Sequence, residues 1–207
     1  MEDGKVSESE MALHGHGALM EGSPYAIPSR KLTVWLFIIS DAVTFGAFLF
    51  AYGYLRVATP NWVRPFETGS LINVIIMTFV LITSSLTMLG AVDSAKAGDK
   101  QKATRFLYST MLLGTIFAAL HLREWFDLFS RKINLASGLF GQTFFTITGL
   151  HLLHVISGVI ALLVIARKFS RDRITPSHVE TMGLYWHFVD LVWMFVVPLV
   201  YLTNIAQ

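Results

Sequence analysis

The chain has 207 residues, of which 54% are hydrophobic and only 14% are charged, and it contains no cysteine. This composition leaves too little polar surface to cover a water-soluble globule, so it indicates an integral membrane protein. The net charge of +2 gives no support to nucleic-acid binding, and the lack of cysteine excludes disulfides, iron–sulfur clusters and thiolate metal sites.

Residues 1–31 are polar and acidic, without the apolar core of a signal peptide. We expect them to form a cytoplasmic tail that stays on the protein and precedes one membrane domain of residues 32–207. His14 and His16 in this tail form an H-x-H pattern, which is more often incidental than a metal site.

Five apolar stretches are long enough to cross roughly 30 Å of hydrocarbon. They are Leu32 to Val57, Leu71 to Val92, Thr104 to Phe126, Gly138 to Ile165, and Thr181 to Thr203. The connections are short and predict antiparallel neighbours, so the expected fold is all-α, a single compact bundle of five transmembrane helices. Glycines punctuate the fourth stretch and let neighbours approach closely, which predicts that this helix is central.

The orientation follows from the positive charges. If the N-terminus is cytoplasmic, 11 of the 16 lysines and arginines fall on the inner side. The positive-inside rule therefore predicts a cytoplasmic N-terminus and a periplasmic C-terminus.

Ionisable residues inside these stretches need a partner or a function, because burying them in a bilayer is costly. His151 and His154 are three residues apart and so lie on one face of the fourth helix, as do His187 and Asp190 on the fifth. A histidine that donates to a buried carboxylate would fix the packing of these two helices. The alternative is a metal site or a haem held by two of the four candidates His121, His151, His154 and His187. Neither an H-E-x-x-H motif nor a Glu-x-x-His pair of the di-iron type is present in the sequence.

Two further acidic groups have open interpretations. Asp41 is the lone carboxylate inside the first stretch, where it either accepts local hydrogen bonds and stays protonated, or handles protons. Arg123, Glu124 and Trp125 lie near the outer interface, where arginine and tryptophan anchor helices. Glu124 is either solvated there or paired with a histidine of the fourth helix.

The last two stretches contain the patterns T-G-x-H-x-x-H-V-x-x-G, at residues 148–158, and Y-W-H-F-V-D-x-V-W, at residues 185–193. With their separation, these resemble subunit III of the haem-copper oxidases. The resemblance extends with less identity over residues 32–203. Ser40 and Asp41 fall where the family usually has a Ser-Glu pair, and residues 120–125 fall where it has a Gln-containing stretch that ends in Glu and an aromatic residue.

The resemblance implies the short five-helix form of this subunit in the inner membrane of a bacterial cell. Such a subunit has no catalytic centre and binds no metal or cofactor, since haem and copper belong to partner subunits I and II. It packs beside the catalytic subunit, holds phospholipids, and supports proton uptake by an oxidase that reduces oxygen to water and pumps protons. Asp41 takes the place of the family's carbodiimide-reactive carboxylate, and the buried polar set consists of Glu124, His151, His154, His187 and Asp190.

Cytochrome c is the expected electron donor of the complex, whereas a quinol oxidase and a paralogue associated with nitric oxide reductase remain alternatives. More distant alternatives are a haem b anchor of a dehydrogenase and a small transporter with Asp41 and Asp190 as proton sites.

Overall fold

The computed structural model describes residues 29–66 and 68–205. These residues form five long helices, each long and apolar enough to cross a membrane. The helices are α2 (Ser29–Ala58), α3 (Thr68–Lys96), α4 (Lys100–Ser130), α5 (Leu139–Ser170) and α6 (Pro176–Val196). The predicted all-α fold with five spanning helices is therefore confirmed. The expected tail with His14 and His16 lies outside the described residues, apart from its last three positions in α2.

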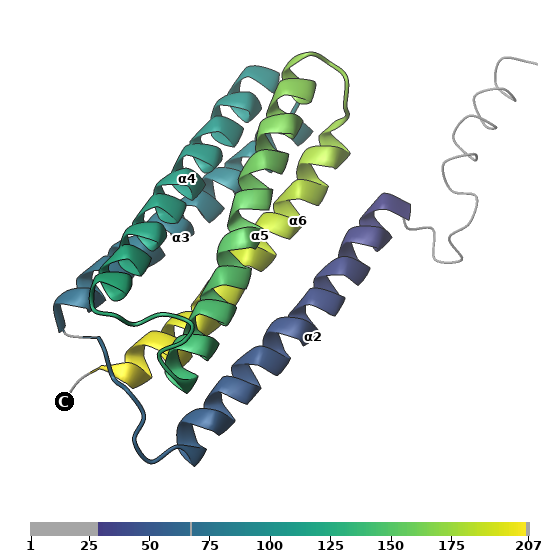
Figure 1. Ribbon diagram of the computed structural model, residues 1–207. Helices are drawn as coiled ribbons and strands as arrows, with labels where there is room; N and C mark the ends of the chain where they lie inside the picture. Colours follow the sequence, from purple (N-terminus) through teal and green to yellow (C-terminus); the bar gives the residue numbers. More distant parts are fainter. Residues whose placement is uncertain (1–28, 67, 206–207) are drawn as a thin grey trace, which may run out of the picture.

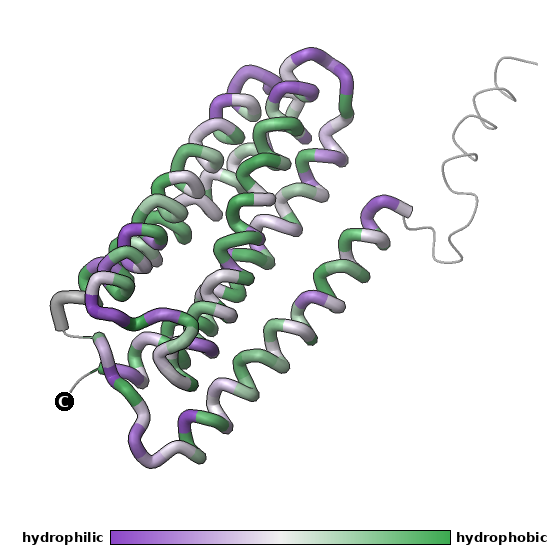
Figure 2. Tube along the Cα trace, viewed as in Figure 1, coloured by the Kyte–Doolittle hydropathy of each residue, from purple (hydrophilic) through white to green (hydrophobic). Residues whose placement is uncertain are grey.

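The helices run alternately up and down, so the start of α2 and the end of the described chain lie at opposite ends (Figure 1). Polar residues gather at the loops and helix ends, and the middle of each helix is apolar (Figure 2). At about 1.5 Å per residue, helices of 29 to 32 residues exceed the roughly 30 Å of a bilayer core. Which end faces the cytoplasm stays a prediction from the positive charges.

The connections are set by local sequence signals. Gly98 has φ of +80°, a left-handed conformation that glycine adopts without strain, and it turns the chain between α3 and α4. Asp99 caps α4 by accepting a hydrogen bond from the Lys102 backbone N–H at 3.0 Å. Pro176 begins α6 because the first turn needs no N–H from it. This helix therefore begins five residues before the predicted apolar stretch.

Pro198 changes the winding at the far end of α6. Proline has no N–H and its ring clashes with the preceding turn, so the α-helical pattern cannot continue through it. The chain widens into the π-helical turn η1 (Val197–Tyr201) and then tightens into the 3₁₀ turn η2 (Leu202–Asn204). These turns place Tyr201 and Asn204, both fully buried, against the rest of the bundle.

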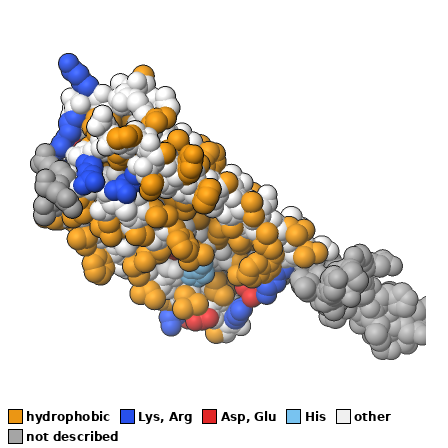
Figure 3. Space-filling view, turned by 90° about the horizontal axis from the view of Figure 1, so that it is seen from below, with side chains coloured by type: hydrophobic (Ala, Val, Ile, Leu, Met, Phe, Trp, Pro, Cys, Tyr) orange, Lys and Arg blue, Asp and Glu red, His pale blue; other side chains and the backbone are white. Residues whose placement is uncertain are grey.

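Helices α3 to α6 pack together, whereas α2 lies at one side of them against α5 and α6 (Figure 1). The buried residues of α2 are Ile38, Phe45 and Tyr52, which are seven residues apart and form one narrow stripe. The bundle is thus less compact than we expected, since most of the surface of α2 is exposed and apolar. Apolar side chains also cover most of the face drawn in Figure 3, with charged side chains toward its margins.

The predicted central position is shared between two helices. Helix α5 contacts α2, α4 and α6, as its glycines suggested. However, α6 is the most buried of the five spans and contacts α2, α3 and α5. Its Trp186 and Trp193 are fully buried, so α6 forms the core of the protein.

Candidate functional site: polar contacts between the helices

Helix α6 is joined to α3 by three polar contacts. They are Trp186 Nε1 with Ser84 Oγ at 3.1 Å, Trp193 Nε1 with Thr78 Oγ1 at 3.1 Å, and His187 Nδ1 with Ser85 Oγ at 2.6 Å. The Ser84 and Thr78 hydroxyls also donate to carbonyls of their own helix, at 2.7 and 2.8 Å. Each of these two hydroxyls therefore accepts from an indole and donates to the backbone, which satisfies a buried polar group in both directions.

Asp41 of α2 contacts His154 of α5. The distance from Asp41 Oδ2 to His154 Nε2 is 3.2 Å, and the two side chains are 13% and 16% exposed. His154 Nδ1 lies 2.7 Å from the Leu150 carbonyl, which only accepts, so the Nδ1 atom carries a proton. Asp41 Oδ2 itself makes no hydrogen bond within the described residues, so the Asp41 and His154 side chains are close neighbours without an aligned hydrogen bond.

This contact corrects the expected partner of the α5 histidines, which we placed on the last helix. Three residues turn a helix by 300°, so His151 and His154 point about 60° apart. Because α2 and α6 lie on adjacent sides of α5, His154 meets Asp41 of α2, whereas His151 meets α6 by stacking on Trp193. The carboxylate beside His154 is therefore Asp41, and Asp190 pairs with neither histidine.

His121 of α4 and His151 of α5 are fully buried in an aromatic core. Both rings pack against Phe117, with centroid distances of 5.8 and 5.7 Å, and against Trp193, at 5.6 and 5.2 Å. None of the four ring nitrogens has a hydrogen-bond partner within residues 29–66 and 68–205. The two histidines thus contribute to the core as aromatic rings.

Glu124 is buried and joins α4 to the end of the chain. The Tyr201 hydroxyl donates to Glu124 Oε2 at 2.9 Å, so this carboxyl pairs with η1 and not with a histidine of α5. Its neighbour Arg123 is exposed. Adjacent helical positions point about 100° apart, which explains why one of the two faces the core and the other faces outward.

Asp190 is also buried, with 9% of its surface exposed. It borders a groove that Ser85 and His187 line as well. His187 pairs with Ser85 of α3 at 2.6 Å.

The far end of the bundle contains a contact that the sequence did not reveal. Asn204 Oδ1 accepts from Trp62 Nε1 at 2.8 Å and from Arg56 Nε at 3.3 Å, and Asn204 Nδ2 donates to the Val200 carbonyl at 2.6 Å and to the Tyr52 hydroxyl. An asparagine near a helix end looks like an ordinary solvated residue in sequence. Its burial depends on the π-helical turn at Pro198, which has no clear sequence pattern beyond the proline itself.

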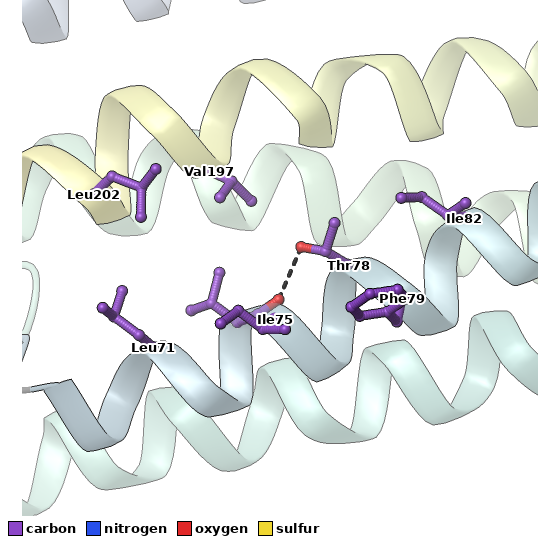
Figure 4. Close-up of a pocket in the computed structure, with 8 residues that line it drawn as sticks. Leu71, Ile75, Thr78, Phe79, Ile82, Val197 and Leu202 are labelled. Atoms are coloured by element: carbon purple, nitrogen blue, oxygen red, sulfur yellow. Dashed lines mark hydrogen bonds between the residues drawn. The ribbon is translucent and has the colours of Figure 1, made fainter.

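The described residues hold no group of three or more His, Asp or Glu side chains that could bind a metal ion. Two apolar hollows lie along α3 and α6. One has a volume of about 320 Å³ and lies between α3 and the Val197–Leu202 segment (Figure 4). The second, of about 280 Å³, borders Asp190.

The fold and these contacts define a polytopic helical membrane protein whose buried polar groups mainly join its own helices. Residues 20–204 match the family model of cytochrome c oxidase subunit III. The chain is 28% identical over 197 residues to cytochrome c oxidase subunit 3 of Alkalihalophilus pseudofirmus, a match that covers 93% of each chain.

Two further bacterial relatives are similar. Cytochrome c oxidase subunit 3 of Corynebacterium diphtheriae is 31% identical over 75% of this chain and 80% of its own. Cytochrome bo(3) ubiquinol oxidase subunit 3 of Pseudomonas aeruginosa is 32% identical over 81% of this chain and 82% of its own. The chain belongs to the cytochrome c oxidase subunit III family, so the resemblance in its last two helices is confirmed. It is a multi-pass protein of the bacterial inner membrane and a component of a haem-copper oxidase complex.

Proposed function

We propose that this chain is the non-redox subunit III of a terminal oxidase that takes electrons from cytochrome c, and that it stabilises the catalytic subunit I beside subunit II. The observation that carries this proposal is that three side chains of the Tyr185–Trp193 motif bond to hydroxyls of α3, namely Trp186, His187 and Trp193. These groups hold helices together, which supports a structural role in the complex.

Relatives named as cytochrome c oxidase subunits favour cytochrome c as the donor of the complex. The ubiquinol oxidase relative of Pseudomonas aeruginosa, at 32% identity, favours quinol as the second candidate. The purified complex should oxidise reduced cytochrome c, with ubiquinol as the comparison substrate under the same conditions. Oxidation of ubiquinol alone would replace the first candidate with the second.

We also propose that haem and copper lie in the partner subunits and not in this chain. Support comes from the packing around His121 and His151, the buried histidines nearest to a bis-histidine arrangement. A haem between two imidazoles needs space for a planar macrocycle, but the fully buried Phe117 and Trp193 lie against both rings. The isolated chain should show no Soret absorption. A stoichiometric b-type spectrum would support a dehydrogenase anchor instead.

Proton uptake is proposed for the pair of Asp41 and His154. The acid and the imidazole lie 3.2 Å apart and both side chains are partly exposed, which leaves a route for proton exchange. The proposed role is to keep protons available to the catalytic subunit during turnover, which a substitution of Asp41 would test through the lifetime of activity.

Phospholipid binding is proposed for the groove between α2 and the α5–α6 pair, which has a volume of about 380 Å³. Its walls are largely apolar, with Phe37 and Ile165 among them, and Arg30 and His178 lie together at its polar end, 3.4 Å apart. An acyl chain fits such walls, and a phosphate fits the cationic end. Extraction of the purified complex should recover phospholipid, and Arg30→Gln should lower the recovered amount.

A further inference from the structure

Ion pairs gather two loops and the start of α2 at one end of the bundle. Glu180 of α6 pairs with Lys31 of α2 at 3.0 Å and with Lys96 of α3 at 3.4 Å. Lys100, at the start of α4, pairs with Asp172 in the connection between α5 and α6. The first turn of α2, the α3–α4 connection and the α5–α6 connection therefore lie at the same end.

This end of the bundle carries many unpaired positive charges. Two of its acidic residues, Asp172 and Glu180, are engaged by lysines, and Asp99 caps α4. Six exposed basic side chains form no ion pair with any residue in 29–66 or 68–205. We call these six the basic face; they are Lys102, Arg105, Arg167, Lys168, Arg171 and Arg173.

The part of the chain that precedes α2 carries the opposite charge. Residues 1–28 contain five acidic residues and one lysine, which is a net charge of −4. Four of the acidic residues are within residues 1–10, namely Glu2, Asp3, Glu8 and Glu10. This segment joins the bundle at Ser29, the first residue of α2, and so at the end that carries the basic face.

The covalent link makes the acidic segment a concentrated partner for the basic face. Glu10 is 19 residues from Ser29, and a coil of that length spans roughly 25 Å, the width of two to three helices. A link of this kind gives an effective concentration on the order of millimolar. A single exposed ion pair contributes little, but four carboxylates opposite six cations can form several pairs together.

Anionic lipid headgroups are the competing occupants, because lysine and arginine near helix ends attract them. The positive-inside rule also accounts for the sign of charge in the loops without any occupant. That rule gives no reason for the acidic segment, since aspartate and glutamate contribute little to topology. Anionic headgroups repel an acidic segment, whereas the basic face attracts it.

We propose that the acidic segment of residues 1–10 docks on the basic face of its own chain. Helix α2 is the least buried of the five spans, so the docked segment supplies a second attachment for this helix. The interaction is electrostatic and is therefore weakened by salt. It depends neither on the electron donor of the complex nor on the identity of its other subunits.

Zero-length cross-linking tests the contact, because a water-soluble carbodiimide joins a carboxylate to an amine only where the two meet. The full-length chain, with the subunits that co-purify with it, is placed in phosphatidylcholine nanodiscs and its cross-linked peptides are mapped by mass spectrometry. We expect carboxylates of residues 1–10 to join Lys102 or Lys168, and this product to be lost at about 0.5 M NaCl.

Two lysines serve as controls in this experiment. Lys31 pairs with Glu180, so their cross-link shows that the reagent reaches this end of the bundle. Lys132 is exposed in the α4–α5 connection at the opposite end and should give no product with residues 1–10. Formation of the Lys31 product alone, or equal yields at Lys132 and at the basic face, would overturn the proposal.

Spin labels test the role of charge, and the absence of cysteine makes the labelling specific. Labels at Ser9→Cys and at Gln101→Cys, an exposed position at the start of α4, should give a narrow distance distribution. Changing the four acidic residues of the segment to their amides should broaden it, whereas Lys5→Gln should not. A broad distribution in the wild type, or an unchanged one in the amide variant, would overturn the proposal.

The lipid composition separates the two occupants. In nanodiscs rich in phosphatidylglycerol, the wild type should keep the narrow distribution that it has in phosphatidylcholine. If the anionic lipid abolishes the narrow distribution, headgroups occupy the basic face in a membrane and the proposal is overturned.

Discussion

The indole of Trp186 lies directly against Gly114, so close that a Cβ atom added to the glycine would be 2.6 Å from the indole Cη2 atom. On the opposite helix, a Cβ at Gly158 would be 2.8 Å from the same ring. Trp186 of α6 is thus held in a notch that a glycine of α4 and a glycine of α5 leave open. Small residues at such positions let helices in a membrane pack closely.

We predict that Gly114→Ala destabilises the protein by about 1 to 3 kcal/mol, because the added methyl group overpacks the core around Trp186. The melting temperature in detergent measures the effect. Gly46→Ala is the matched control, since a Cβ at Gly46 meets nothing within 4 Å. An equal fall in melting temperature for both variants would show that the loss of stability does not come from the contact between Gly114 and Trp186.

The indole N–H of Trp186 gives a second prediction. Ser84→Ala removes the acceptor of this buried N–H and should cost about 1 to 3 kcal/mol of stability. Thr83→Ala is the control on the same helix, because the exposed Thr83 hydroxyl bonds only to the Phe79 carbonyl of α3. Denaturation of the two variants side by side would contradict the prediction if Ser84→Ala were as stable as Thr83→Ala.

A third prediction concerns the contact between the C-terminal end of α2 and Asn204, near the end of the described chain. Asn204→Leu removes the acceptor of the Trp62 and Arg56 side chains, so the loop of residues 59–66 should open more often. Faster amide hydrogen exchange in that loop is the expected result. Thr44→Val is the control, since the exposed Thr44 hydroxyl bonds back to the Ser40 carbonyl of α2. Unchanged exchange in the Asn204 variant would argue that the contact does not hold the loop.

The fourth prediction tests Asp41. An Asp41→Asn oxidase should assemble with its normal haem content but lose activity faster during turnover, because the pair with His154 can no longer exchange a carboxyl proton. Asp41→Glu is the control that keeps the carboxyl group and should preserve most of the lifetime. If the Asn and Glu variants both behave like the wild type, Asp41 has no part in proton supply.

The fold was largely predictable because its main determinant is local. Stretches of apolar residues that match the bilayer thickness identify spanning helices in sequence, and all five were found. Helix ends were less predictable. Helix α6 begins at Pro176 and α4 continues to Ser130, because polar turns beyond the apolar stretch are still helical.

The contacts were less predictable than the helices, because a partner depends on helix rotation and on which helix lies beside which. His154 illustrates this, since its spacing from His151 suggested a shared partner on the last helix, but the position of α2 placed Asp41 beside it. Asn204 depends on the π-helical turn at Pro198, and its partners Trp62 and Arg56 are more than 140 residues away in the chain. No local sequence pattern predicts a contact between residues so far apart in the chain.

The most direct measurement is affinity purification of this chain from its native membrane in mild detergent, followed by identification of every co-purifying subunit and an optical spectrum. We expect a complex with a much larger haem-bearing polypeptide, and haem absorption that stays with that polypeptide when this chain is dissociated. Recovery of the chain without any oxidase subunit, or a stoichiometric haem that remains with the isolated chain, would contradict it.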